Sequence, residues 1–465
     1  MAWLHSRRLH YWCGAIGILF VSFAALRALF FIGFSGFELS ALSQTEAVAQ
    51  TLGMGLRFDL RLAILLMLPI ALLAWLPKWN LVSCRLLRWL ARLYLALALG
   101  AVFLIYIFDF GHYAYLGVRI NATALRFLGD AQISTDMLWQ TYPVIWISLG
   151  WLALTALLCW LLVRLERVTL ERPAKRIGRL SLVWGSALMV VLVFLGILGR
   201  LENINLENPV PLRWSDAFFS GDNQIAALGL NPVIFLYDTL EVPHEPFDRA
   251  AVTAHYEVVS SYLGVDQPDV QNLNFLRQQA AQPYAIAGSQ PPNVVFVMLE
   301  SLGTSAVGAY GNPLNPTPNL DRLAKQSWFF KHFYVPVTGT AKTVWASISG
   351  VPDVSREDTS TRNPLITRQH TLINSLEGYD RYYMLGGSAG WANMNALVRQ
   401  SIDGVELFEE GDWTSPLVDV WGISDLSLFK ESDRILRQRP AGKPFFAYIQ
   451  TAGNHRPFTI PAEND

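Results

Sequence analysis

Five long runs of apolar residues fill the first 200 positions of this chain, and they constrain its fold more than any other feature. A helix needs about 20 predominantly apolar residues to cross a bilayer. The composition agrees, because 52% hydrophobic and only 16% charged residues are typical of a membrane protein. Residues 1–200 are therefore predicted to form a five-span transmembrane domain, with spans at about 11–34, 58–77, 90–110, 143–163 and 180–199.

Basic residues in the short loops predict the orientation of these spans. They gather before the first run and after the second and fourth runs, at Arg7, Arg8, Lys78, Arg85, Arg88, and at six positions from Arg164 to Arg179. Loops rich in Lys and Arg remain on the cytoplasmic side. We therefore expect a multi-pass protein of the cytoplasmic (inner) membrane, with a cytoplasmic N-terminus and an extracytoplasmic (periplasmic) chain after residue 200.

Charge and cysteine content exclude two classes of function. The net charge of −1 gives no basis for nucleic-acid binding. The three cysteines are Cys13, Cys84 and Cys159, so none lies in the second half. A disulfide framework or a cysteine-rich zinc site is thereby excluded from the extracytoplasmic part.

Beyond the apolar runs, the pattern changes twice. Residues 201–290 are predicted to form a juxtamembrane helical connector, which ends in a stretch rich in Pro, Gly and Ala. From residue 291 to 465, strands and helices are predicted to alternate, which indicates an α/β domain with a mostly parallel sheet. The expected strands are 293–299, 381–386 and 444–450, and the expected helices are 318–327, 343–350, 370–378, 391–400 and 422–438.

Two stretches of the second half carry the residues for chemistry. NVVFVMLES is predicted to be a buried strand that presents Glu300 at its carboxyl end, where open α/β sheets bind ligands. TGTAKTVWASISG is predicted to be a loop that enters a helix, with Thr343 in or near the first turn. Negative charge is favoured at a helix N-terminus. Together they predict a metal-assisted nucleophile for a phosphate or sulfate ester, although Thr338 and Thr340 remain close rivals of Thr343 and Ser347 is a weaker one.

Other residues fit around such a site. A carboxylate such as Glu300 is a hard oxygen ligand suited to Mn²⁺, Mg²⁺ or Zn²⁺. Lys342 is expected near the developing negative charge, and a histidine after a strand, His455, can orient or protonate a substrate oxygen or ligate a metal. Further candidates for substrate contact are Arg456, Trp391 and Asn393. The simpler alternatives are a solvent-facing acid, a helix-capping threonine, a loop histidine and a core tryptophan.

The stretches NVVFVMLES, TPNLDRLAKQS, GTAKT, LGGSAGWANM and GNHRPF resemble those of the lipoteichoic-acid-synthase-like phosphoglycerol transferases, in the alkaline phosphatase and sulfatase superfamily. The resemblance covers nearly the whole chain. It implies a Mn²⁺ or Mg²⁺ site with Glu300 as a ligand, Thr343 as the metal-bound nucleophile, and His455 and Trp391 as substrate contacts. It also implies transfer of phosphoglycerol from phosphatidylglycerol to a glycan or polymer hydroxyl through a phosphothreonine.

The chain departs from this family in one respect. Family members carry a downstream Asp-His pair that completes the metal site, and no Asp-His dipeptide follows Thr343 here. We therefore expect a C-terminally incomplete sequence of an active enzyme, with a truncated, silent product as the alternative. LGGSAGWANM also lacks an acidic residue that some relatives carry in the equivalent loop.

Three other functions stay open. One is a phosphoethanolamine transferase, although the absence of cysteines after residue 159 speaks against it. Another is a sulfatase or phosphodiesterase, although the residues after Thr343 fit the sulfatase nucleophile pattern badly. A third is a non-catalytic, lipid-binding regulatory membrane protein. The identity of the acceptor and the oligomeric state are not readable from the residues.

Overall fold

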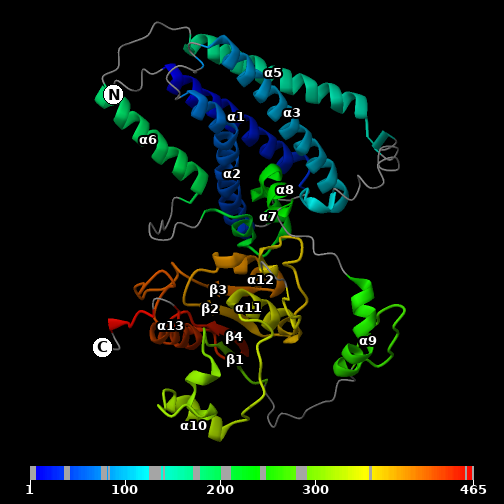
Figure 1. Ribbon diagram of the computed structural model, residues 1–465, viewed down its shortest axis with the longest axis vertical. Helices are drawn as coiled ribbons and strands as arrows, with labels where there is room; N and C mark the ends of the chain where they lie inside the picture. The colour runs from blue at the N-terminus through cyan, green and yellow to red at the C-terminus, as the bar shows by residue number, and fades with distance from the viewer. Residues whose placement is uncertain are drawn as a thin grey trace. The chain divides into compact units, whose positions relative to one another are not determined.

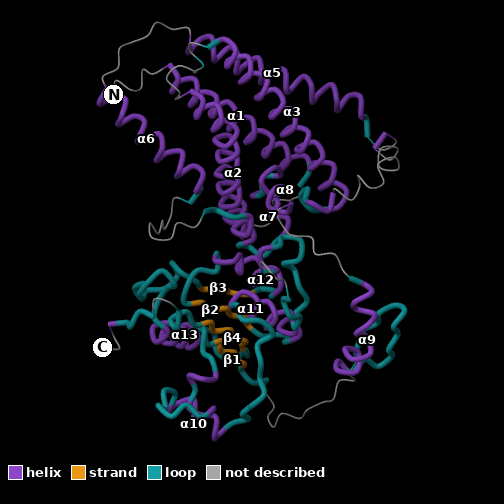
Figure 2. The backbone as a smooth tube through the Cα atoms, viewed as in Figure 1, coloured by secondary structure: helices purple, strands orange, loops and turns teal. Residues whose placement is uncertain are grey.

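A computed structural model describes most of the chain as two compact units, shown in Figures 1 and 2. One unit joins Met1–Leu240 to Val294–Asp465, and the other is Glu241–Asn293. The described residues are 7–35, 42–74, 81, 84–124, 138–139, 142–170, 179–200, 211–240, 248–278, 291–354, 359–455 and 458–462.

Long helices lie over all five predicted apolar runs. They are α1 (Arg7–Gly33), α2 (Leu42–Ala74), α3 (Arg85–Leu116), α5 (Val144–Leu170) and α6 (Arg179–Leu198). Within the described ranges, α1, α3 and α5 have the length and composition to cross a membrane, whereas the apolar part of α6, Val183–Leu198, is shorter. The number of spans, their orientation and the domain boundaries remain predictions.

A buried ionic cluster connects these helices. Arg27 of α1 and Asp59 of α2 form an ion pair at 2.7 Å, and Asp59 is fully buried. Asn231 donates to Asp59 at 2.8 Å and to the hydroxyl of Tyr106 of α3 at 3.0 Å. Arg27 also donates to the carbonyl of Leu230 at 3.1 Å. Since buried charges are costly unless they are paired, this cluster fixes the segment of α7 (Asn223–Gly229) and α8 (Pro232–Leu240) against the long helices.

The second half contains a four-stranded parallel sheet, as predicted. The strand order is β1-β4-β2-β3, with β1 (Val294–Met298), β2 (Asp380–Leu385), β3 (Val405–Phe408) and β4 (Phe445–Gln450). The prediction of a buried first strand was wrong, because β1 lies at the sheet edge and Val295, Phe296 and Val297 are exposed. The short strand β3 was not predicted.

Helices cover both faces of this sheet. Alternating side chains of β2 and β4 point to opposite faces, so that Tyr383 and Tyr448 pack with α11 (Thr340–Ser349) and α12 (Met394–Ser401). Tyr382 and Ala447 face the side that includes Leu428 of α13 (Asp425–Gln438). Figure 1 shows α11 and α13 on either side of the strands. The helix α10 is Pro318–Gln326.

One predicted helix and three predicted helix starts were wrong, since α12 and α13 begin three residues later than predicted, at Met394 and Asp425. Residues 370–378 form only a short 3₁₀ turn, η7 (Leu372–Ser375). Helix α11 begins at Thr340, three residues earlier than predicted, because Gly339 serves as its N-cap and accepts the first helical hydrogen bond, from the backbone of Thr343 at 2.9 Å. This earlier start changes which hydroxyl stands at the helix N-terminus.

The smaller unit contains α9 (Arg249–Leu263), which lies within the predicted helical connector of residues 201–290. Its N-cap is Asp248, whose side chain accepts from the backbone of Ala251 at 3.0 Å. The helix ends at Gly264 in the left-handed conformation. Tyr256 is buried and accepts a hydrogen bond from the backbone of Asp269, which holds the following loop against the helix.

Candidate active site

Glu300 lies just beyond the carboxyl end of β1, where it was predicted. Its backbone N–H donates to the hydroxyl of Thr451 at 2.8 Å, and the backbone of Thr451 donates to Met298 at 3.0 Å. The parallel pairing of β1 with β4 therefore brings residues 151 positions apart to one end of the sheet. Glu300 is only 8% exposed, and its carboxylate accepts from Ser301 at 2.8 Å.

The hydroxyl that meets Glu300 belongs to Thr340. Its Oγ1 lies 3.0 Å from each of the two carboxylate oxygens. Thr340 is the first residue of α11, so its hydroxyl stands among backbone N–H groups that lack helical partners. A carboxylate, a hydroxyl and a helix N-terminus thus meet at one point, which is the combination that the sequence predicted.

Thr343 does not lie in that position. Its hydroxyl is directed to the backbone carbonyl of Val337 at 3.3 Å, and it does not line the cavity that contains Glu300. Lys342 does not line this cavity either, and its methylene groups lie alongside Gly339. Because α11 starts earlier than predicted, the geometry favours Thr340 as the nucleophile over Thr343.

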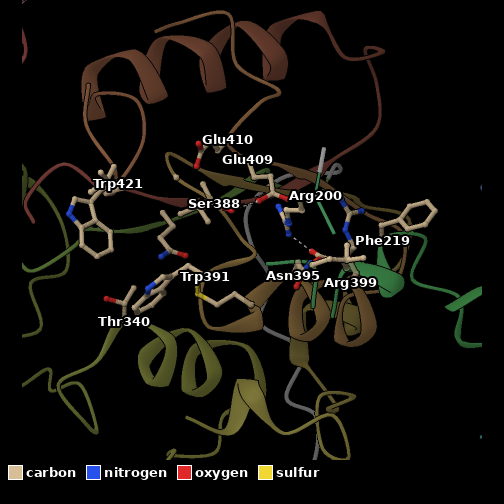
Figure 3. A pocket seen from close by; sticks show the side chains of 18 of the residues that line it. Arg200, Phe219, Thr340, Ser388, Trp391, Asn395, Arg399, Glu409, Glu410 and Trp421 are labelled. Carbon is tan, nitrogen blue, oxygen red and sulfur yellow. Dashed lines mark hydrogen bonds and ion pairs between the residues drawn. The ribbon is translucent and has the colours of Figure 1, made fainter. Parts of the chain in front are cut away.

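Glu300 and Thr340 line a cavity of 640 Å³, part of which Figure 3 shows. Thr340, Trp391 and Trp421 gather at one end in this view, and Arg200, Arg399 and Phe219 lie at the other. The lining comes from both halves of the larger unit. It includes Gln50, Gly53, Met54, Arg57, Leu198, Arg200, Leu212, Asp216, Phe219, Ser388, Asn395, Arg399, Glu409, Glu410, Gln450, Thr451 and His455.

Aromatic rings form one wall beside Thr340. His455 lies against Trp421 with ring centroids 3.6 Å apart, and Trp421 meets Trp391 edge-to-face at 6.3 Å. Trp391 is 37% exposed, so it faces the cavity rather than the core. Both Trp391 and His455 therefore line the cavity that contains Glu300 and Thr340. Trp421 was not predicted, and its only signal was its position beside the predicted helix 422–438.

Asn393 has a different position from the one predicted. It is 5% exposed, and its side-chain oxygen accepts from Ser215 at 3.1 Å and from Arg213 at 3.4 Å. These bonds connect the turn η8 (Trp391–Asn393) to η3 (Trp214–Phe218). Asn393 does not line the cavity, whereas Asn395 does. Arg456 lies outside the described residues.

Charged side chains that were not predicted occupy the other end of the cavity. Arg200 and Asp216 form an ion pair at 2.6 Å. Burial raises the pKa of Glu409, although the backbone N–H of Ala389 and the charge of Arg399 oppose this shift. Burial likewise raises the pKa of Glu410, with Arg200 opposing. These groups come from separated parts of the chain, and no local pattern marks them.

The ligand atoms beside Thr340 suit a hard divalent cation. A carboxylate and a hydroxyl are the oxygen donors that Mn²⁺ and Mg²⁺ prefer. In the part of the chain that the structure describes, no group of three or more His, Cys, Asp and Glu side chains comes together. Glu300 and Thr340 therefore fit such an ion in kind and supply part of a coordination shell.

Comparisons with known proteins found a matching family and several relatives. Residues 292–464 match the Sulfatase family. A lipoteichoic acid synthase-like protein of Bacillus subtilis is 27% identical over 180 residues, which cover 36% of this chain and 28% of that protein. The lipoteichoic acid synthase of Staphylococcus saprophyticus is 23% identical over 205 residues, which cover 41% and 31%. Human arylsulfatase A is 45% identical over 53 residues, which cover 11% and 10%.

A solved structure of a Vibrio parahaemolyticus protein in the alkaline phosphatase superfamily is also similar. It is 32% identical, with a TM-score of 0.33, over 37% of this chain and 42% of that one. By the family match over residues 292–464, the second half of this chain is a sulfatase-like domain. Within the superfamily it is lipoteichoic-acid-synthase-like, which confirms the resemblance found in the motifs. The chain spans less than a third of the length of these two synthase relatives.

Proposed function

We propose that this protein is a membrane-bound, metal-dependent transferase that moves phosphoglycerol from phosphatidylglycerol to a glycan or polymer hydroxyl, through a phosphothreonine at Thr340. The contact between Thr340 and Glu300 at the N-terminus of α11 carries the proposal. The membrane is the expected location, since long apolar helices precede the domain. The inner membrane and the periplasmic side are part of the proposal.

The chemistry follows from the residues present. In the first half-reaction, Oγ1 of Thr340 forms a bond to phosphorus, and the bond from phosphorus to the diacylglycerol oxygen breaks. The hydroxyl proton of Thr340 passes to solvent water, and the departing diacylglycerol oxygen takes up a proton. His455, on the same cavity wall, is placed to donate it. Backbone N–H groups at the start of α11 favour the negative charge on the phosphoryl oxygens.

The second half-reaction returns the enzyme to its starting state. The acceptor hydroxyl forms a bond to phosphorus, the bond to Thr340 breaks, and the threonine regains a proton. Glu300 and Thr340 would hold a divalent cation, which we propose to be Mn²⁺, with Mg²⁺ or Zn²⁺ as alternatives. Such an ion lowers the pKa of a bound hydroxyl and neutralises charge on the phosphoryl group.

Hydrolysis is the second candidate, because the arylsulfatase similarity favours it. In that case water takes the place of the glycan or polymer, and a sulfate or phosphate diester is cleaved. The hydroxyl that meets Glu300 at the start of α11 belongs to a threonine, where a sulfatase would carry a cysteine or serine, and this favours the phosphoglycerol reaction. A phosphoethanolamine transferase and a non-catalytic lipid-binding protein stay as alternatives.

The test uses the purified chain in vesicles that contain phosphatidylglycerol and Mn²⁺. We expect release of diacylglycerol, and mass spectrometry of the trapped protein should find the added phosphoglycerol mass on the peptide that contains Thr340. Free glycerol phosphate as the sole product would indicate hydrolysis. Cleavage of an aryl sulfate without any reaction of phosphatidylglycerol would contradict the proposal.

A further inference from the structure

The cavity extends from the catalytic residues onto the helices of the first half, and this extension has no role in the proposed chemistry. Its lining includes Gln50, Met54 and Arg57 on α2, and Leu198 at the end of α6. The residues that follow α6, including Arg200 and Leu212, complete this end. A helix that served only as an anchor would have no reason to line the substrate cavity.

Helix α2 packs closely on helix α6 next to this end of the cavity. Gly196 of α6 lies against Ile64 of α2, so closely that a Cβ atom at Gly196 would stand 2.3 Å from the side chain of Ile64. One turn nearer the cavity, Arg61 donates to the carbonyls of Leu198 at 2.9 Å and of Leu212 at 2.8 Å. Arg57, one further turn along α2, lines the cavity, as does Leu198 at the end of α6. Because the apolar part of α6 ends at Leu198, we expect this end of the cavity to lie at the level of the lipid headgroups.

Arg200 is the charged group best placed to meet such a headgroup. One of its terminal nitrogens pairs with Asp216, whose other oxygen accepts from the backbone of Arg213 at 2.7 Å, so the arginine is held in position. Its Nε is buried and has no hydrogen-bond partner among the described residues. A Cβ atom at Gly390 would lie 3.3 Å from the guanidinium, so the glycine leaves room for Arg200 next to Trp391.

Acidic and basic side chains are mixed at this end of the cavity. Asp216 offsets part of the charge of Arg200, and burial, which raises the pKa of Glu409 and Glu410, disfavours the charged forms of these two carboxyls. Arg399 lines the same end. A phosphodiester offers charged oxygen acceptors, which arginine binds with short, strong hydrogen bonds.

We propose that Arg200 captures the headgroup of an anionic glycerophospholipid at the membrane end of the cavity, between α2 and α6, before its phosphorus reaches Thr340. The first half of the chain thus supplies part of the donor site. Leu198, Leu212 and Met54 would contact the glycerol backbone of the lipid. This inference rests on the proposed function for the identity of the donor.

The kinetic test compares two donors. One is phosphatidylglycerol in vesicles, and the other is a water-soluble aryl ester of glycerol phosphate without acyl chains. Arg200→Gln should raise the KM for the lipid by about tenfold or more, because it removes a charge-assisted hydrogen bond, and should leave kcat nearly unchanged. The soluble donor should be turned over as by the native protein, and Arg200→Lys should recover much of the lipid KM.

Asp216→Asn is the matched control, because it removes the negative charge of the ion pair but keeps the arginine and a side-chain oxygen that can accept its hydrogen bond. It should leave the lipid KM close to the native value. An equal rise in the lipid KM in Asp216→Asn and Arg200→Gln would mean that the ion pair only stabilises the fold, and would overturn the proposal. An equal loss with both donors in Arg200→Gln would place Arg200 at the reacting centre instead.

A binding test gives an answer without turnover. The photoreactive residue p-benzoylphenylalanine replaces Phe219 inside the cavity or, as a control, Leu314, which is 85% exposed and outside it. Irradiation with phosphatidylglycerol vesicles should attach lipid at position 219 and not at 314, and Arg200→Gln should reduce the yield. No adduct at 219 would overturn this inference. Thr340→Ala should still form the lipid adduct at position 219 but should abolish transfer. The adduct therefore tests the lipid site, and transfer tests the proposed chemistry.

Discussion

The hydroxyl of Thr340 donates to both carboxylate oxygens of Glu300, at 3.0 Å each, although 40 residues separate them. The hydroxyl of Thr343, one helical turn further on, is directed to a backbone carbonyl instead. The two threonines therefore have different environments despite their proximity in the sequence. This difference allows a direct test of the nucleophile.

Thr340→Ala should lower phosphoglycerol transfer by a factor of about 10³ or more, because a covalent intermediate cannot form without the hydroxyl. Thr343→Val is the matched control, since it removes a hydroxyl of the same helix at constant shape. It should change the rate by about twofold at most. Diacylglycerol release from vesicles measures both. A dead Thr343→Val enzyme with an active Thr340→Ala enzyme would reverse our assignment.

Glu300→Gln should weaken metal binding by at least about tenfold, since outer-shell substitutions alone cost this much. The readout is the rise in the melting temperature that Mn²⁺ causes, together with the Mn²⁺ concentration that gives half-maximal transfer. Glu377→Gln, on an exposed turn, should bind metal normally. The role of Glu300 as a ligand would be rejected if its glutamine variant were stabilised by Mn²⁺ as strongly as the native protein.

Asp59→Ala should destabilise the helices of the first half by about 3–5 kcal/mol, because it leaves the buried cation of Arg27 without its carboxylate. The double variant Arg27→Met with Asp59→Leu removes both charges and should recover most of that loss. Thermal unfolding in detergent measures the three proteins. The explanation by an unpaired buried charge would be wrong if the double variant were less stable than Asp59→Ala.

Glu431 on α13 should make stability depend on pH. A hydrogen bond from Thr414, with further bonds from Arg434 and Ser415, lowers the pKa of Glu431 to about 2. A carboxyl with a lowered folded pKa stabilises the protein above its unfolded pKa and loses this contribution as the pH falls through the folded value. We expect Glu431→Gln to cost on the order of 2 kcal/mol at neutral pH and progressively less between about pH 5 and pH 2.

Urea unfolding of both proteins across this pH range measures the difference. Asp433→Asn lies on the same helix and is the control, because its ion pair with Arg437 is solvent-exposed and should contribute little at any pH. If the free energies of unfolding of the native protein and Glu431→Gln differed by the same amount from neutral to acid pH, the lowered pKa of Glu431 would not be the cause.

Local patterns were sufficient for most of the elements. The apolar runs indicated the long helices, and the apolar stretches before Glu300 and Thr451 indicated β1 and β4, because side-chain periodicity is a property of neighbouring residues. Strand β3 was not predicted, because Val405–Phe408 has only four residues and one of them is charged. Likewise, Asn393 beside Trp391 looked like a second substrate contact, yet it bonds to Ser215, which lies 178 positions away.

The sequence by itself determined that apolar helices precede a parallel α/β domain, and that Glu300 stands at the end of its first strand. The tertiary structure alone decided which threonine meets that carboxylate, because the helix start at Gly339 and the position of α11 against the sheet set the direction of each hydroxyl. It also decided that Trp421 and Arg200 share one cavity with Thr340. Residues so far apart in the chain become neighbours only through strand pairing and the packing of α2 and α6, which no local pattern records.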